Sequence, residues 1–98
     1  MAKTWDAVLD PDEIRDFGVN WLPQLTDKKN AVIKTIITSV WSVESGSVQI
    51  LAQTNTDTNT TVRLTGGTLG EVCNLLNTVT LSDNERYEQT CQLRVAER

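Results

Sequence analysis

The clearest alternation of apolar and polar side chains lies in the last third of the chain. Between residues 72 and 81 every second position is apolar except Asn77, and these apolar residues are Cys73, Leu75, Val79 and Leu81. After Ser-Asp-Asn-Glu at 82–85 the alternation resumes, and its apolar residues are Tyr87, Cys91, Leu93 and Val95. Two runs of period two around a short polar turn predict a β-hairpin. Its apolar face requires a second sheet or another chain to cover it.

Residues 10–13, Asp-Pro-Asp-Glu, have the composition of a helix start. An aspartate can cap the first amides, a proline suits the first helical position, and acids are favoured near the positive end of the helix dipole. The following Phe17, Val19 and Trp21 alternate with polar or small residues, which indicates a strand, and Pro23 does not allow a helix to continue through it. We therefore expect one helical turn that sets the angle of entry into the first strand.

The middle of the chain reads as short strands separated by turns. The segment 31–43 is dense in β-branched residues on both parities, which predicts a strand covered on both faces and hence central in a sheet. The other predicted elements are a polar break at 22–31, a turn at 44–47, a strand at 48–53, a polar loop at 53–61, a strand around 62–64 and a glycine-rich turn at 66–70.

These elements predict an all-β fold, an antiparallel β-sandwich of about six or seven strands with at most one helical turn. A small barrel is the alternative. A chain of 98 residues has room for one core. We divide it into an N-terminal arm and hinge at 1–13 and a sandwich domain at 14–98.

The charge of the chain restricts the classes of partner that we expect it to bind. Nine basic against thirteen acidic residues give a net charge of -4, and the basic residues are scattered apart from Lys28 and Lys29. Because phosphate binding needs clustered basic residues, we expect neither nucleic acid nor an anionic membrane as partner. No apolar run has the length of a membrane span, and the first residues lack the apolar core of a secretory signal. The protein is expected to act where it is made or to leave by lysis.

Candidate chemistry is sparse. The chain has no histidine, so the commonest general base and zinc ligand are both missing. We expect no carboxylate near the cysteines on the inward face, and Ile14 stands where the acidic stretch 10–16 would need a third calcium ligand. The sequence therefore predicts no catalytic residue, no cofactor and no metal, and a protein that is not an enzyme.

Cys73 and Cys91 are expected to be two buried thiols rather than a disulfide. A hairpin centred near Ser82 would place them opposite each other, and one centred near Asn84 would separate them. Both registers keep the inward face, so the sequence leaves the choice open.

The three tryptophans differ in context. Trp41 is expected in the core, and Trp21 in the core or at its rim. Trp5 lies in the polar N-terminal segment. It either folds back to seal one end of the sandwich or anchors the arm on another protein.

Two stretches carry a resemblance to a known family. One is W-x-x-x-x-D-P-D-E-x-x-D-F-x-V-N-W, from Trp5 to Trp21. The other comprises L-T-G-G-T-x-G-E, then N-T-V-T at 77–80 and L-R-V-A-E-R at 93–98. With them the sequence resembles small virion proteins of tailed bacteriophages, which have an immunoglobulin-like sandwich and are described as neck, head-to-tail or fibre-to-tail adaptors.

The resemblance implies a non-enzymatic structural part of a phage particle, assembled in the bacterial cytoplasm. The role is that of a connector in the neck, the collar or the fibre attachment. The implied partners are portal or neck, tail or fibre subunits, with repeated copies in a ring. The alternative is capsid decoration or an immunoglobulin-like module that binds a host surface or carbohydrate. For residues 1–13 we expect docking on a neighbouring virion protein. The candidate interface residues are Trp5, Asp10, Pro11, Asp12 and Glu13.

Overall fold

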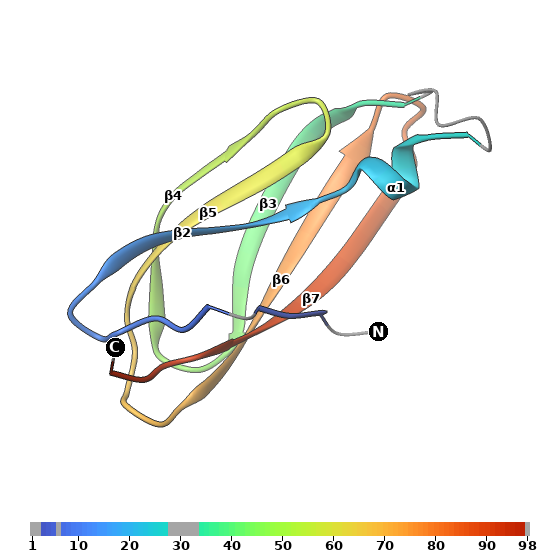
Figure 1. Cartoon of the computed structure of the whole chain (residues 1–98). Helices are drawn as coiled ribbons and strands as arrows, with labels where there is room; N and C mark the ends of the chain where they lie inside the picture. Colours follow the sequence, from blue (N-terminus) through green and yellow to red (C-terminus); the bar gives the residue numbers. More distant parts are fainter. Residues whose placement is uncertain (1–2, 6, 28–33, 98) are drawn as a thin grey trace.

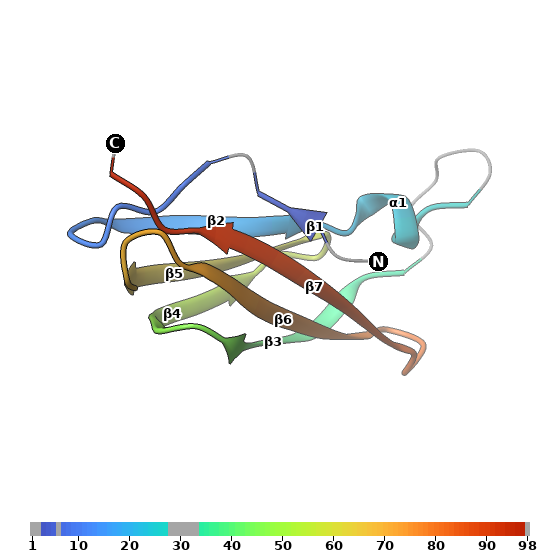
Figure 2. The same ribbon diagram turned by 90° about the horizontal axis from the view of Figure 1, so that it is seen from below.

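Two β-sheets packed face to face make up the protein (Figures 1 and 2). The computed structural model describes residues 3–5, 7–27 and 34–97. One sheet has the strand order β1-β7-β6-β3 and the other β2-β5-β4. The elements are β1 (Lys3–Thr4), β2 (Ile14–Asn20), α1 (Leu22–Leu25), β3 (Ile36–Ser45), β4 (Val48–Asn55), β5 (Asn59–Gly66), β6 (Val72–Leu81) and β7 (Arg86–Arg94). The predicted all-β sandwich is confirmed.

The strand grouping is that of an immunoglobulin domain. Strands β3, β6 and β7 correspond to its C, F and G strands, and β2, β5 and β4 to its B, E and D strands. Trp41 on β3 is 3% exposed and takes the place of the tryptophan that immunoglobulin domains bury on strand C. The pairs between long strands are antiparallel, whereas the two-residue β1 runs parallel to β7.

The core lies between the sheets, and β6 and β7 supply much of it. Burial alternates along β6 as the sequence predicted, with Asn77 at 0% exposure among the apolar residues. On β7 the predicted inward residues are buried as well, except that Tyr87 is half-buried. Each fully buried leucine in such a core contributes about 1.5–3 kcal/mol relative to an exposed one.

The prediction that the segment 31–43 forms a central strand is wrong. Its described part, β3, is an edge strand whose one sheet neighbour is β6. The register shifts between Ile36 and Thr38, and this irregularity lets Ile36 and Trp41 both face the core although their parities differ. As a result Ile37 and Val40 are 56% and 57% exposed instead of covered. Residues 28–33, with the lysine pair, lie outside the described residues.

The helical turn is also not where the sequence predicted it. Residues 10–13 form a hydrogen-bonded turn, not a helix, and the one short helix is α1, within the predicted polar break. Pro23 lies in the first turn of α1, where its missing amide removes no helical hydrogen bond. The Asn20 side chain accepts a hydrogen bond from the Leu22 amide (3.0 Å) at this start.

The predicted polar loop at 53–61 is mostly strand. β4 extends to Asn55 and β5 begins at Asn59, so three residues make the turn. Threonine favours a pleated strand, and this preference outweighs the low hydrophobicity of the segment. A side chain caps this turn, since the Thr56 hydroxyl accepts hydrogen bonds from the amides of Thr58 (3.3 Å) and Asn59 (3.1 Å).

The β6–β7 register separates the two cysteines. Cys73 pairs with Leu93, and Leu75 pairs with Cys91, so the hairpin is centred on Asp83 and the thiols lie diagonally across the strands. Both thiols are buried and not bonded to each other, which confirms the expectation of two thiols.

Candidate interaction surfaces

The N-terminal segment lies along the sandwich, between β7 and β2. The Trp5 amide donates to the Gln92 carbonyl (3.0 Å), and the Trp5 indole Nε1 donates to the Gly18 carbonyl (3.0 Å). Trp5 is 8% exposed, and its ring lies 4.9 Å from that of Phe17 and 5.8 Å from that of Trp41, centroid to centroid. In the single chain Trp5 is therefore folded back onto the sandwich.

The acidic turn at residues 10–13 is held by its own hydrogen bonds. The Glu13 amide donates to the Asp10 carbonyl (2.8 Å), and the Asp10 amide donates to Glu13 Oε1 (3.1 Å). The Asp12 amide donates to Asp10 Oδ1 (3.0 Å). The bond from the Asp10 amide to the Glu13 side chain is one half of a capping box, here without a helix to follow. Asp12 is exposed, while Asp10, Pro11 and Glu13 are half-buried, so the turn presents a fixed acidic surface.

A buried polar network at Asn77 links the two sheets. Its Oδ1 accepts hydrogen bonds from Trp21 Nε1 (2.9 Å) and from the Thr60 hydroxyl (2.7 Å). Its Nδ2 donates to the Ser39 hydroxyl (2.9 Å) and the Val40 carbonyl (3.2 Å). All four hydrogen-bonding positions of the amide are thus used, which removes the cost of burying it. The signal in the sequence was the polar residue within an apolar alternation.

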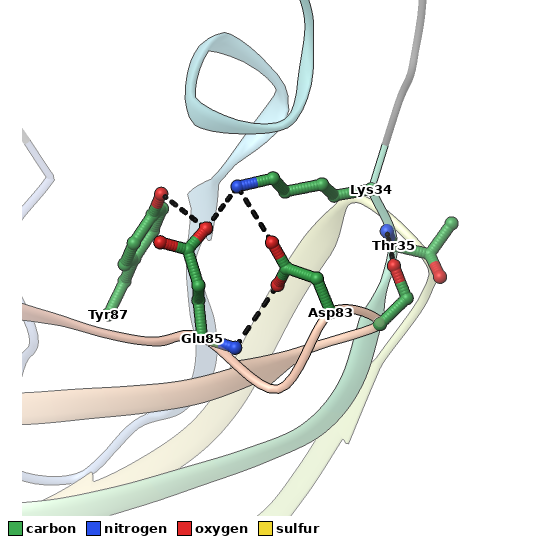
Figure 3. Close-up of polar contacts among 6 residues, drawn as sticks. Lys34, Thr35, Asp83, Glu85 and Tyr87 are labelled. Atoms are coloured by element: carbon green, nitrogen blue, oxygen red, sulfur yellow. Dashed lines mark hydrogen bonds and ion pairs between the residues drawn. The ribbon is translucent and has the colours of Figure 1, made fainter.

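A charged cluster ties the start of β3 to the β6–β7 turn (Figure 3). Lys34 forms ion pairs with Glu85 and with Asp83, the latter at 3.0 Å, and its Nζ lies 5.9 Å from the ring centroid of Tyr87. The Thr35 amide donates to the hydroxyl of Ser82 (3.1 Å). The hydrogen bond to Glu85, and to a smaller extent the one to Asp83, raises the pKa of Lys34. In turn, the hydrogen bond from Lys34 lowers the pKa of Asp83. Sequence reasoning missed this cluster because its members are about 50 positions apart.

A second cluster, at the opposite end, centres on Glu71. Its Oε1 accepts hydrogen bonds from the Ser47 hydroxyl (2.8 Å) and amide (3.1 Å), from the Thr68 amide (3.2 Å) and from Cys73 Sγ (3.2 Å). These bonds, the Ser47 hydroxyl first, lower the pKa of Glu71 to about 2. The expectation that no carboxylate lies near a cysteine is therefore wrong. Burial, and then Glu71, raises the pKa of Cys73, so this thiol is not activated.

The β3–β4 side of the sandwich is joined by one side chain. Gln53 Oε1 accepts a hydrogen bond from the Trp41 amide (2.8 Å), and Gln53 Nε2 donates to the Trp41 carbonyl (3.5 Å). The glutamine thus occupies the backbone groups at the outer edge of β3, where another strand would otherwise bond.

The outer face of the β2-β5-β4 sheet carries one ion pair. Arg63 Nε and Nη2 donate to the two carboxylate oxygens of Asp16 (2.8 and 3.2 Å), and Arg63 lowers the pKa of Asp16. Beside this pair lies a shallow hollow of about 130 Å³, and its lining residues are Asp16, Ala52, Thr54, Thr61 and Arg63. Because the two charges neutralise each other, the hollow offers no net charge to a ligand.

Among residues 3–5, 7–27 and 34–97, no group of three or more histidine, cysteine or acidic residues is placed to hold a metal ion. Within the same residues no helix is long and apolar enough to cross a membrane. The arrangement offers surfaces and edges for protein contacts.

The comparisons with known proteins agree with a role in protein contacts. No curated protein matches the chain. A family model described as podophage GP4 fiber-tail adaptor protein gp77 matches residues 9–94, which include the acidic turn and all of the sandwich strands except β1. The chain therefore belongs to the podophage GP4 fiber-tail adaptor protein gp77 family, and it is a structural adaptor of a bacteriophage virion.

Proposed function

We propose that this protein attaches a fibre to the tail of a podophage through protein-protein contacts alone, without catalysing a reaction. The observation that carries the proposal is the family match over residues 9–94. The described surface fits it, since its polar clusters link elements of the fold to one another and the acidic turn is preformed.

We propose further that several copies form a ring at the junction of neck and tail, assembled in the host cytoplasm. Tail, fibre and portal or neck subunits are the neighbours. Particles are built from symmetric arrays, so a part that joins several fibres to one tail is expected in several copies. Nucleic acid and membrane are not partners in this proposal, in keeping with a net charge of -4.

Within the N-terminal segment, the acidic turn is the proposed docking site for a neighbouring virion protein. Asp12 is exposed, and the turn is held by its own hydrogen bonds, so we expect docking on it to cost little ordering entropy. Trp5 takes part by holding the segment on the sandwich, because its ring is buried.

Quantitative mass spectrometry of purified particles tests the proposal. We expect a stoichiometric, ring-like copy number per particle, and absence from particles would overturn the proposed function. The variant Asp12→Lys should reduce incorporation, whereas the control Glu88→Lys, an equal charge change at an exposed position of β7, should not. Equal incorporation of both variants would exclude the acidic turn as a docking site.

A further inference from the structure

Strand β4 differs from its neighbours because half of it buries no side chain. Residues 51–55 are all exposed, although the strand stays paired with β5 as far as Asn55 and Thr60. In β5 and β6 burial alternates along the strand instead. β4 also lies at the edge of its sheet, with β5 as its sheet neighbour. Apart from the Gln53 side chain, which bonds the backbone of Trp41 on β3, both faces and one edge of residues 51–55 therefore meet solvent.

Edge strands usually carry a feature that prevents pairing with other chains, such as a charge, a proline or a covering segment. The edge of β2 has the Trp5 indole bonded to its Gly18 carbonyl, and the edge of β3 has Gln53 on the backbone of Trp41. β4, with the sequence VQILAQTN, has neither a charged residue nor a proline. A register shift between Ile50 and Ala52 is its one irregularity, and it leaves Leu51 at 51% exposure.

Charges at the two ends of β4 indicate which strand could pair with it. Glu44, shortly before the strand, and Asp57, shortly after it, are both exposed. If a second copy paired antiparallel along this edge, the Asp57 of one copy would approach the Glu44 of the other, and like charges would repel. A strand with a neutral middle and basic ends would instead find opposite charges at both ends.

The hollow on the outer face lies next to this edge, since Ala52 and Thr54 of β4 form part of its wall. When a strand adds to a sheet edge, main-chain hydrogen bonds supply affinity and pockets for alternate side chains supply specificity.

We propose that the outer edge of β4 pairs with an extended segment of a partner virion protein, neutral and β-branched in its middle and carrying lysine or arginine at its ends. This inference rests on the proposed function, because it names the surface and the chemistry of one adaptor contact.

A synthetic peptide of three Thr-Val repeats, flanked by two lysines at each end, probes the edge directly. Titrated into the ¹⁵N-labelled full chain, it should shift the amide signals of residues 48–55. A peptide with glutamates in place of the lysines should bind about tenfold more weakly at low salt. Shifts confined to other strands, equal affinity of the two peptides, or dimers of the chain joined through β4 would each overturn the proposal.

Particles provide the second test, through two variants with the same change in charge at similar exposure. Leu51→Lys places a charge on the edge, where Leu51 is 51% exposed, and Leu69→Lys places it in the β5–β6 loop, where Leu69 is 57% exposed. We expect Leu51→Lys to lower incorporation about tenfold and Leu69→Lys by less than about twofold. Equal incorporation of the two would overturn the proposal.

Hydrogen exchange on the same particles separates the two levels of inference. Residues 48–55 should exchange more slowly in particles than in the isolated chain. If the wild-type protein is present in particles but these amides exchange as fast as in isolation, the edge proposal fails while the adaptor function stands. If the protein is absent from particles, the adaptor function fails and the edge proposal fails with it.

Discussion

Two polar clusters connect segments of the sandwich that are distant in sequence, one around Asn77 and one around Lys34. Asn77 is fully buried and bonds four groups from three segments, whereas Lys34 and its two carboxylates remain in contact with water. Both clusters link β3 to β6 or to the turn that follows it. The two clusters therefore link similar elements of the fold but differ in their exposure to solvent.

This difference in exposure determines how much each cluster contributes to the free energy of unfolding. In the core, a group that loses its partner has no water to replace it, so its desolvation cost appears in full. At the surface, water and salt compensate a lost ion pair, and such pairs commonly contribute little. We therefore expect the Asn77 cluster to determine whether the sandwich folds and the Lys34 cluster to adjust the order of one end.

The largest expected effect comes from Asn77→Ala. The change leaves the buried Trp21 Nε1 and the Thr60 hydroxyl without their common acceptor, and it should lower the free energy of unfolding by about 3 kcal/mol. Urea denaturation followed by tryptophan fluorescence measures it. A loss below about 0.5 kcal/mol would mean that the buried network carries no more weight than a surface pair.

Trp21→Phe should have a smaller effect. It removes one donor to Asn77 Oδ1 but leaves the bond from the Thr60 hydroxyl, and the smaller ring leaves part of the buried volume empty, so we expect a loss of about 2 kcal/mol. The double variant with Asn77→Ala should lose less than the sum of the two, because both changes remove the same hydrogen bond. Strict additivity in the denaturation data would contradict the network.

We expect the contribution of Glu71 to stability to lie between those of the Asn77 and Lys34 clusters, and this contribution depends on pH. Its pKa is about 2 in the folded chain and near 4.5 without these partners. Its contribution is therefore present above pH 4.5 and is lost as the pH falls towards 2. Thermal unfolding of wild type and Glu71→Gln should differ at pH 7 and converge at low pH. An equal difference at every pH would show that the charge of Glu71 does not matter.

Lys34→Met should have the smallest effect on stability, below that of Trp21→Phe. The pairs with Glu85 and Asp83 are open to solvent, so the difference from wild type should shrink further when salt is added. Since partners raise the pKa of Lys34, the contribution should persist at neutral pH and fade above the ordinary lysine pKa. A salt-independent loss as large as that of Asn77→Ala would remove the distinction between the clusters.

The sequence predicted best those strands in which one face is at least half-buried along its whole length. In β6 and β7 the alternation identifies the inward residues, including Asn77. It failed at β3, where an irregularity at Ile37 changes parity, and at 53–61, where threonines form strand without apolar support.

The contacts between distant segments could not be predicted in the same way. Lys34 and Glu85, or Glu71 and Ser47, meet because the sheet register brings the turns together. Register depends on all pairs of a sheet at once, and a single sequence leaves it open, as it did for the two cysteines. Local patterns thus predicted the fold class but missed the Lys34 and Glu71 clusters, which join segments at the two ends of the sandwich.

The three indole groups of this protein experience three different environments, which makes them spectroscopic probes of separate regions. The Nε1 proton of Trp5 points to a backbone carbonyl and that of Trp21 to a side-chain amide. The buried Nε1 of Trp41 has no acceptor among the described residues. In a proton NMR spectrum, the three indole signals should therefore be resolved without isotope labelling. Detachment of the N-terminal segment would move the Trp5 signal, and loss of the Asn77 network would move that of Trp21.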